Sequence, residues 1–338
     1  MRFSQVQNRW KLLSGYLTGS SDLQAFPMTL IVENTAKCNL ECPMCPREFG
    51  YYPPEDFDFT VFKQIIDEVR HKTELVFPWG AGEPMMNPDI YKMIRYCKDA
   101  DIYTVVSTNA TLLNEARSHQ IIDSGLDNLI IAFDGATPEV YEKYRKGADF
   151  EKVRANILQF LDVKKRRNAD LFVVLQMVRL PENSCQVKDF HKMWSIDGVD
   201  EIRIKEDEIV IPEVALEERI NHDRRRHPCY QLWQGPATIN YKGDFFPCCH
   251  MWQSEPIGNI NDQSLFELWN SKQIQRMREA HLSGDLSDYP DCQNCHAPNP
   301  RLPVVLGSFM VDIFQVRRWI PKMEKVAIFY KLPLFRDR

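Results

Sequence analysis

The chain lacks the sequence features of export, membrane insertion and nucleic-acid binding. Its first residues, MRFSQVQNRWKLLSGYL, contain neither the apolar core nor the small-residue cleavage site of a signal peptide. No apolar run approaches the length of about 18 residues that marks a membrane-spanning helix. The formal net charge of -5 gives the surface no general attraction for nucleic acid. We therefore expect a cytoplasmic protein without a nucleic-acid partner.

Disulfides are not expected either, although the chain has ten cysteines. In a reducing compartment, clustered cysteines bind metal more often than they pair with each other. The 338 residues are 44% hydrophobic and 26% charged, and a chain of this size and composition buries a core without disulfides. The sequence also lacks internal repeats and low-complexity tracts.

Six short, nearly continuous apolar runs predict buried parallel strands. The runs are residues 28–34, 74–80, 102–108, 129–135, 171–178 and 201–207. Helical patterns lie between them, and this alternation is typical of βαβ units. Six units predict either a doubly wound sheet or a partial (β/α)6 barrel of the TIM type. In both folds the chemistry lies at the C-terminal ends of the strands.

Four helix starts can be placed from their capping residues. The proposed first or capping residues are Thr60, Asn87, Thr137 and Asp149. A proline follows both Asn87 and Thr137, as is favourable at the first helical position.

Polar residues lie late in, or directly after, each of the six predicted strands. They are Cys38, the stretch GAGEP at 80–84, Ser107 with Asn109, Asp134, Gln176 and Lys205. Because parallel strands end at one edge of the sheet, we expect these side chains to share one site.

The first of these groups contains three cysteines and lacks a fourth nearby. Cys38, Cys42 and Cys45 are spaced C-x3-C-x2-C, whereas a zinc ribbon uses paired C-x2-C knuckles. Thiolates at this density suit an iron–sulfur cluster, which usually takes four cysteines. Either one ligand comes from a distant residue, or one iron stays open to a substrate or cofactor.

The segment CNLECPMC (38–45) resembles the CxxxCxxC motif of the radical S-adenosylmethionine superfamily. In that family the open iron of a [4Fe–4S] cluster binds the amino and carboxylate groups of S-adenosylmethionine. The reduced cluster cleaves the cofactor to a 5′-deoxyadenosyl radical, which abstracts a substrate hydrogen. The resemblance covers roughly residues 28–207 and implies a partial barrel and a reducing electron donor such as flavodoxin or ferredoxin.

The same resemblance implies contacts with S-adenosylmethionine. AGEP (81–84) is similar to a GGEP motif, with Ala81 in place of the usual glycine, and AFDG (132–135) is similar to SxDG, with Ala132 in place of serine. The implied cofactor-binding residues are Met44, Gly82, Glu83, Ser107, Asn109, Asp134, Arg145 and Gln176. Gln176 and Lys205 are equally compatible with the substrate pocket. For Asp134 a helix cap, and for Arg145 a solvated helix charge, are the alternatives.

A second group of five cysteines follows the barrel. Cys229, Cys248, Cys249, Cys292 and Cys295 occur with GDFFPC and a terminal CxxC, which resembles the SPASM or twitch module. A full SPASM module carries about seven cysteines for two auxiliary clusters, so the shortfall predicts one auxiliary [4Fe–4S] cluster. The predicted ligands are Cys229, Cys248, Cys292 and Cys295; zinc in the same four thiolates is the alternative.

The remaining cysteines and nearby histidines have weaker assignments. Cys249 is a buried thiol, the ligand in place of Cys248, or a catalytic hydrogen-atom donor to a substrate radical. Cys97 and Cys185 are expected to be structural. His250 and His296 adjoin predicted ligands and are expected to lie outside the ligand set.

The two ends are basic and amphipathic. We divide the chain into an N-terminal extension (1–27), the barrel core (28–211), the auxiliary module (212–300) and a basic tail (301–338). Such ends either contact a membrane surface or dock on the open edge of the partial sheet. Membrane contact would give a peripheral protein and favour a lipid-linked substrate.

These observations predict an oxidoreductase that abstracts hydrogen from a sugar, an aminocyclitol or a lipid-linked glycan. The outcome is dehydrogenation through the auxiliary cluster, or epimerisation through Cys249. A peptide-modifying maturase of the same superfamily is the alternative enzyme. A non-catalytic metal-binding scaffold is the alternative of another class, and it leaves the polar strand ends unexplained.

Overall fold

The computed structural model describes residues 3–45, 47, 53–206, 227–251, 254–293, 295 and 302–310. The chain forms two compact units, Met1–Asn299 and Pro300–Arg338. In the second unit the structure describes helix α13 (Leu302–Met310). His296, residues 207–226 and most of the basic tail lie outside the described residues.

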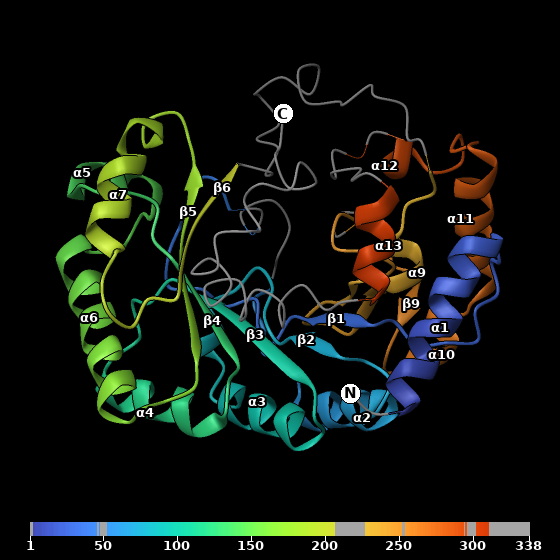
Figure 1. The fold of residues 1–338 in the computed structure, drawn as a ribbon, viewed down its shortest axis with the longest axis horizontal. Helices are drawn as coiled ribbons and strands as arrows, with labels where there is room; N and C mark the ends of the chain where they lie inside the picture. The colour runs from blue at the N-terminus through green and yellow to red at the C-terminus, as the bar shows by residue number, and fades with distance from the viewer. Residues whose placement is uncertain are drawn as a thin grey trace. The chain divides into compact units, whose positions relative to one another are not determined.

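One nine-stranded sheet organises the first unit, in the order β6-β5-β4-β3-β2-β1-β7-β8-β9 (Figure 1). The barrel strands are β1 (Thr29–Val32), β2 (Leu75–Phe77), β3 (Tyr103–Thr108), β4 (Asn128–Ala132), β5 (Phe172–Arg179) and β6 (Glu201–Glu206). All six are parallel and follow one another in chain order, so these barrel strands contain no switch point. The predicted partial barrel is confirmed, and the doubly wound alternative is wrong.

Helices cover the outer face of this sheet (Figure 1). They are α2 (Phe59–Val69), α3 (Ile90–Asp99), α4 (Glu115–Ser124), α5 (Pro138–Tyr144), α6 (Phe150–Arg166) and α7 (Val187–Trp194), with short 3-10 helices η2 (Pro84–Met86) and η3 (Ser184–Gln186). Alternate strand residues such as Leu129, Val173 and Leu175 are buried against them in one core cluster. The intervening residues of each strand therefore face the inside of the barrel.

Two of the four predicted helix starts are confirmed. Thr137 precedes α5, and Asp149 caps α6 by accepting from the backbone of Lys152. The other two are wrong by one and two residues. Helix α2 begins at Phe59, not Thr60, and the N-cap residue of α3 is Asp89, not Asn87. Asn87 instead closes a turn: its Oδ1 accepts from Asp89 N at 2.9 Å.

The auxiliary module continues the barrel sheet. Strand β7 (Ala237–Ile239) pairs in parallel with β1, and β8 (Asp244–Phe246) and β9 (Gly258–Asn259) add antiparallel strands. Its helices are α9 (Gln231–Gln234), α10 (Leu265–Trp269), α11 (Lys272–Ser283) and α12 (Pro290–Gln293). The pairing covers the edge of β1, so the described barrel and module share one sheet.

The N-terminal helix α1 (Phe3–Thr18) docks on this unit. Arg9 forms a buried ion pair with Glu74, and Nε to Oε1 is 2.6 Å. Tyr16 packs edge-on against Trp233 of α9, with ring centroids 5.4 Å apart. Among the described residues, no helix combines the length and the apolarity needed to cross a bilayer.

Candidate functional site

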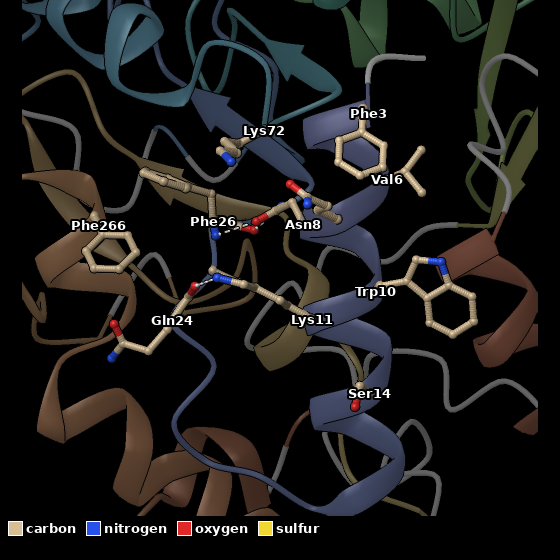
Figure 2. Close-up of a pocket in the computed structure, with 12 residues that line it drawn as sticks. Phe3, Val6, Asn8, Trp10, Lys11, Ser14, Gln24, Phe26, Lys72 and Phe266 are labelled. Atoms are coloured by element: carbon tan, nitrogen blue, oxygen red, sulfur yellow. Dashed lines mark hydrogen bonds between the residues drawn. The ribbon is translucent and has the colours of Figure 1, made fainter.

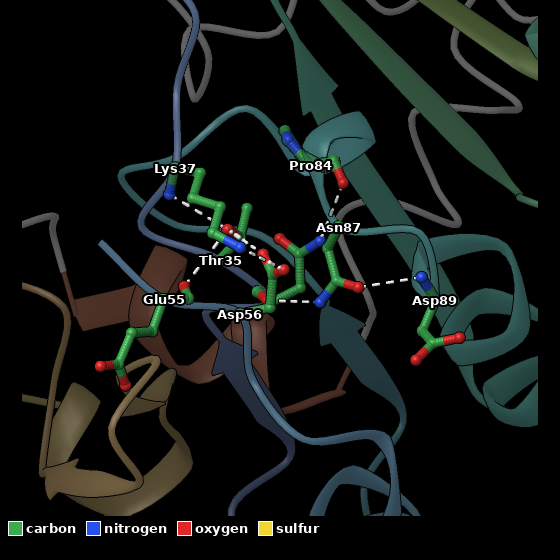
Figure 3. Close-up of polar contacts among 8 residues, drawn as sticks. Thr35, Lys37, Glu55, Asp56, Pro84, Asn87 and Asp89 are labelled. Carbon is green, nitrogen blue, oxygen red and sulfur yellow. Dashed lines mark hydrogen bonds and ion pairs between the residues drawn. The ribbon is translucent and has the colours of Figure 1, made fainter. Parts of the chain in front are cut away.

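The loop after β1 carries the first three cysteines, and its stem is held from two sides (Figure 3). On one side, Asp56 accepts from Thr35 Oγ1 at 2.7 Å and from Lys37 Nζ at 2.7 Å. On the other side, Asn87 Nδ2 donates to the carbonyl of Asn34 at 2.7 Å. These bonds fix the direction in which the chain leaves β1, and therefore the position of Cys38.

Cys38, Cys42 and Cys45 lie close together in the described structure. Cys42 is buried, and Cys38 and Cys45 pack beside it in one apolar cluster. Burial raises the pKa of the Cys42 thiol to about 11; Arg145 opposes this, and charge on Cys45 or Cys38 would add to it. The three cysteines therefore pack together, as ligands of one group would.

This donor set fits an iron–sulfur cluster. Among the described residues, no three His, Cys, Asp or Glu side chains converge as ligands of a single metal ion would. A [4Fe–4S] cluster binds each thiolate at a different iron, so its ligands surround a volume. Three soft sulfurs that pack together, with the Arg145 guanidinium 4.0 Å from Cys42 Sγ, suit that requirement.

Gly82 and Glu83 lie against the stem of the cysteine loop. A Cβ atom on Gly82 would stand 2.3 Å from the carbonyl oxygen of Thr35 and 2.7 Å from that of Lys37. Glu83 is buried and accepts from Thr108 Oγ1 at 2.7 Å and from Asn109 N at 2.8 Å. The Glu83 carboxylate therefore joins the end of β2 to the end of β3.

We expect Gly82→Ala to displace the cysteine loop, because the new methyl overlaps two backbone carbonyls. The cost is about 1–3 kcal/mol of unfolding free energy, and iron bound after reconstitution should fall by more than half. The matched control is Ala81→Gly, which restores the more common motif and removes a side chain. Thermal unfolding and iron analysis check both. Wild-type iron content in Gly82→Ala would contradict this role.

Asp134 and Arg145 form a buried ion pair beside Cys42. Arg145 Nε donates to Asp134 Oδ2 at 2.7 Å, and Val178 N donates to Asp134 Oδ1 at 2.7 Å. Arg145 Nη1 also lies 4.0 Å from Cys42 Sγ. Asp134 raises the pKa of Arg145, so the guanidinium stays charged. Asp134 is thus placed to act through Arg145, and Arg145 is not a solvated helix charge.

The other predicted cofactor residues lie around these groups. Asn109 is buried, with Nδ2 3.9 Å from Cys38 Sγ. Met44 is buried in the apolar cluster that contains Cys42. Ser107 is half-buried on β3. Gln176 pairs in register with Ala132 and accepts from Arg203 Nη1 at 3.4 Å.

Two residues of this site were missed by sequence reasoning. Asn183 is fully buried, and its Nδ2 donates to the carbonyls of Asp134 at 3.1 Å and Val178 at 2.8 Å. Arg203 reaches Gln176 and also donates to Glu201 Oε1 at 2.9 Å. Period-2 alternation on β6 was the available signal for Arg203, since Ile202 and Ile204 pack outward. Asn183 had none.

The second cysteine group gathers around Cys248. Cys248 is nearly fully buried, which raises its pKa well above the ordinary value, and charge on Cys229, Cys249 or Cys292 would raise it further. Cys292 is also buried, and Cys295 N donates to its carbonyl at 3.4 Å. Cys229, Cys249 and Cys295 are half-buried. Three thiols near one buried sulfur, with Cys295 bonded through its backbone to Cys292, again fit a cluster.

The remaining predicted residues divide between core and surface. Cys97 is fully buried on α3, which confirms its structural assignment. Cys185 is exposed on η3, with Sγ 3.7 Å from the carbonyl of Glu182, so the structural role expected for it is wrong. His250 is half-buried next to Cys249. Lys205 is half-buried on β6.

Comparison with known families and proteins agrees with this geometry. Residues 32–193 match the sequence model of the radical SAM superfamily, and residues 229–296 match that of the SPASM iron–sulfur cluster-binding domain. The PqqA peptide cyclase of Gluconobacter oxydans is 25% identical over 286 residues, which is 74% of this chain and 78% of the relative. A cofactor-modifying protein for tungsten-containing aldehyde ferredoxin oxidoreductase from Pyrococcus furiosus is 24% identical over 322 residues, which is 79% of this chain and 86% of that relative.

Two solved structures share the fold. SuiB of Streptococcus suis, bound to its precursor peptide SuiA, has a TM-score of 0.61 and 15% identity, over 80% of this chain and 70% of that chain. BtrN, in complex with AdoMet and 2-DOIA, has a TM-score of 0.51 and 15% identity, over 80% and 93%.

Proposed function

Because the chain belongs to the radical S-adenosylmethionine superfamily and carries an iron–sulfur SPASM module, we propose that it is an oxidoreductase acting on a carbon-bound hydrogen of a polyhydroxylated substrate. It is a radical S-adenosylmethionine enzyme that binds [4Fe–4S] clusters and S-adenosylmethionine. The position of the Asp134–Arg145 pair beside Cys42, whose loop also carries Cys38 and Cys45, is the observation that carries the proposal.

The chain's own residues prepare the site for this chemistry. Cys38, Cys42 and Cys45 would hold the first cluster, and the guanidinium of Arg145 offers a planar fork for a carboxylate. When bound, the cluster and S-adenosylmethionine supply one-electron chemistry that generates a radical able to abstract a substrate hydrogen. An external reductant such as flavodoxin or ferredoxin supplies the electron.

Cys229, Cys248, Cys292 and Cys295 would hold one auxiliary cluster. The burial of Cys248 and its electrostatic coupling to Cys229 and Cys292 support Cys248 as the ligand. Cys249 then remains as a candidate hydrogen-atom donor. If Cys249 donates a hydrogen atom to the substrate radical, the product formed in deuterated water carries one deuterium. The product formed by Cys249→Ser then carries none. If the substrate is dehydrogenated instead, the product is two hydrogens lighter in both variants.

The substrate proposal rests on the inner face of β5 and β6. Gln176 and Arg203 project there together, and the alternation also places Lys205 on this face. Such amide and cationic groups suit the hydroxyls of a sugar, an aminocyclitol or a lipid-linked glycan. The BtrN complex with 2-DOIA supports a small-molecule substrate, whereas the PqqA peptide cyclase and SuiB support a peptide.

A substrate panel separates these two enzyme classes. We expect aminocyclitols, nucleotide sugars or lipid-linked glycans to raise 5′-deoxyadenosine formation above the uncoupled rate by about tenfold or more, as substrate positioning does in general. Peptides should leave it unchanged. Mass spectrometry of the reaction mixture checks whether a product forms. Stimulation by peptides alone would replace the sugar proposal with the maturase alternative.

Peripheral membrane contact through α1 is a second proposal. Phe3, Trp10 and Leu17 recur every seven residues on α1 and are 77%, 58% and 60% exposed. Figure 2 shows Phe3 and Trp10 projecting from α1 beside a cavity of about 1050 Å³ that Lys11 and Lys72 also line. Exposed aromatic residues with lysines nearby suit an anionic lipid surface. Trp10→Ser should weaken binding to phosphatidylglycerol vesicles, whereas Leu158→Ser, at an exposed leucine of α6, should not.

A further inference from the structure

The side chain of Asn109 lies between the first cysteine of the loop and the turn that follows β3. Its Nδ2 is 3.9 Å from Cys38 Sγ and 3.2 Å from Asn39 Oδ1. The side chain is buried, with 5% of its surface exposed. The resemblance to the family implied that Asn109 contacts S-adenosylmethionine, and a contact with a cysteine was not part of that assignment.

Thr111 fixes which end of the Asn109 amide faces the sulfur. Asn109 Oδ1 accepts from Thr111 Oγ1 at 2.6 Å and from Thr111 N at 3.0 Å. Asn39 Nδ2 donates in turn to Thr111 Oγ1 at 2.8 Å. With Oδ1 taking two donors, the amide NH2 must point toward Cys38, because a flipped amide would place a donor against two donors.

The backbone at Asn109 is held independently of its side chain. Asn109 N donates to Glu83 Oε2 at 2.8 Å, and Asn156 Nδ2 donates to the carbonyls of Ala110 at 3.0 Å and Thr111 at 3.1 Å. A change of the Asn109 side chain therefore leaves the turn with its main anchors. This makes the contact with Cys38 testable by substitution.

A hydrogen bond to a ligand sulfur draws electron density from it and stabilises the more negative, reduced form of an iron–sulfur cluster. We propose that Asn109, oriented by Thr111, donates to the Cys38 thiolate and raises the reduction potential of the first cluster. Asn109 is thus a positioning and tuning residue. The inference rests on the proposed assignment of Cys38 as a ligand of that cluster.

The test is a potentiometric titration of the reconstituted full chain, followed by electron paramagnetic resonance. The signal to follow is the one that changes when S-adenosylmethionine is added, because that signal belongs to the first cluster. Asn109→Leu should lower the ratio of reduced to oxidised cluster at a fixed potential by up to about tenfold, which is about 59 mV for one electron. Thr111→Val should shift the ratio in the same direction by less.

The matched control is Thr111→Ser, which keeps the hydroxyl that orients the amide and should leave the potential unchanged. A wild-type potential in Asn109→Leu with full iron content would overturn the inference. So would an equal shift in Thr111→Ser and Thr111→Val. If Asn109→Leu binds no iron, the inference is tested by comparing the reduction potentials of Thr111→Val and Thr111→Ser. A wild type without any signal that responds to S-adenosylmethionine would instead refute the assignment of Cys38.

Discussion

Asp134→Ala is expected to lower the unfolding free energy of the cluster-free protein by about 3–5 kcal/mol, because it leaves a buried guanidinium without its carboxylate. Asp134 is fully buried, and the Arg145 side chain is only 15% exposed. The substitution also removes the acceptor of Val178 N. Denaturant unfolding measures the change.

Two further variants separate the stability effect from the functional one. Asp197→Ala removes a carboxylate 2.7 Å from Lys165 Nζ, but that pair is exposed and screened by water, so its loss should change stability far less than Asp134→Ala does. The double variant Asp134→Ala/Arg145→Met should be more stable than Asp134→Ala, since no charge is left buried. It should nevertheless form no 5′-deoxyadenosine. Equal losses of stability in Asp134→Ala and Asp197→Ala would contradict the ion-pair argument.

The second large effect is expected in the auxiliary module, where Arg278→Met should cost about 3–5 kcal/mol, since each buried acceptor left without a donor costs about 1–3 kcal/mol. Arg278 is fully buried on α11 and donates to the carbonyls of Leu232 at 2.8 Å, Ser21 at 2.9 Å and Trp269 at 3.1 Å. Its guanidinium also lies over the Trp269 ring, 5.0 Å from the centroid.

Arg276→Met, two residues away on the exposed face of α11, is the matched control and should change stability by less than about 0.5 kcal/mol. Arg278→Lys keeps the charge but not the planar fork that spans three carbonyls, so it should recover only part of the loss. Urea unfolding of the three variants tests this. If Arg278→Lys matched the wild type, charge and not geometry would explain the role of Arg278.

The strands and the cysteine loop could be predicted because their signals are local. Buried parallel strands are recognised by their continuous apolar runs. Cys38, Cys42 and Cys45 all lie within one stretch of eight residues. The start of α3 could not be placed, because the Asn87 side chain donates to the carbonyl of Asn34, 53 residues earlier, and does not cap the helix. Capping residues predict a helix start only when no distant backbone competes for them.

The contacts that orient the site could not be predicted from the sequence for a related reason. Asn183 meets Asp134, and Arg278 meets Ser21, only after the chain has folded. The pairing of β7 with β1 joins residues more than 200 positions apart, and the hydrophobic periodicity of the sequence does not predict which strands pair. The resemblance gave Asp134 and Asn109 direct cofactor roles, whereas the geometry gives each a partner within the chain, Arg145 and Cys38.

The most direct test of the central claim is iron and sulfide content after anaerobic reconstitution, with 5′-deoxyadenosine assayed after dithionite reduction. The wild type should bind about eight irons, and the Cys38/Cys42/Cys45→Ala variant about four, since each [4Fe–4S] cluster holds four. Only the wild type should cleave S-adenosylmethionine, and Cys185→Ala should match it. A triple variant that cleaves the cofactor at the wild-type rate, or a wild type that binds no iron, would contradict the account.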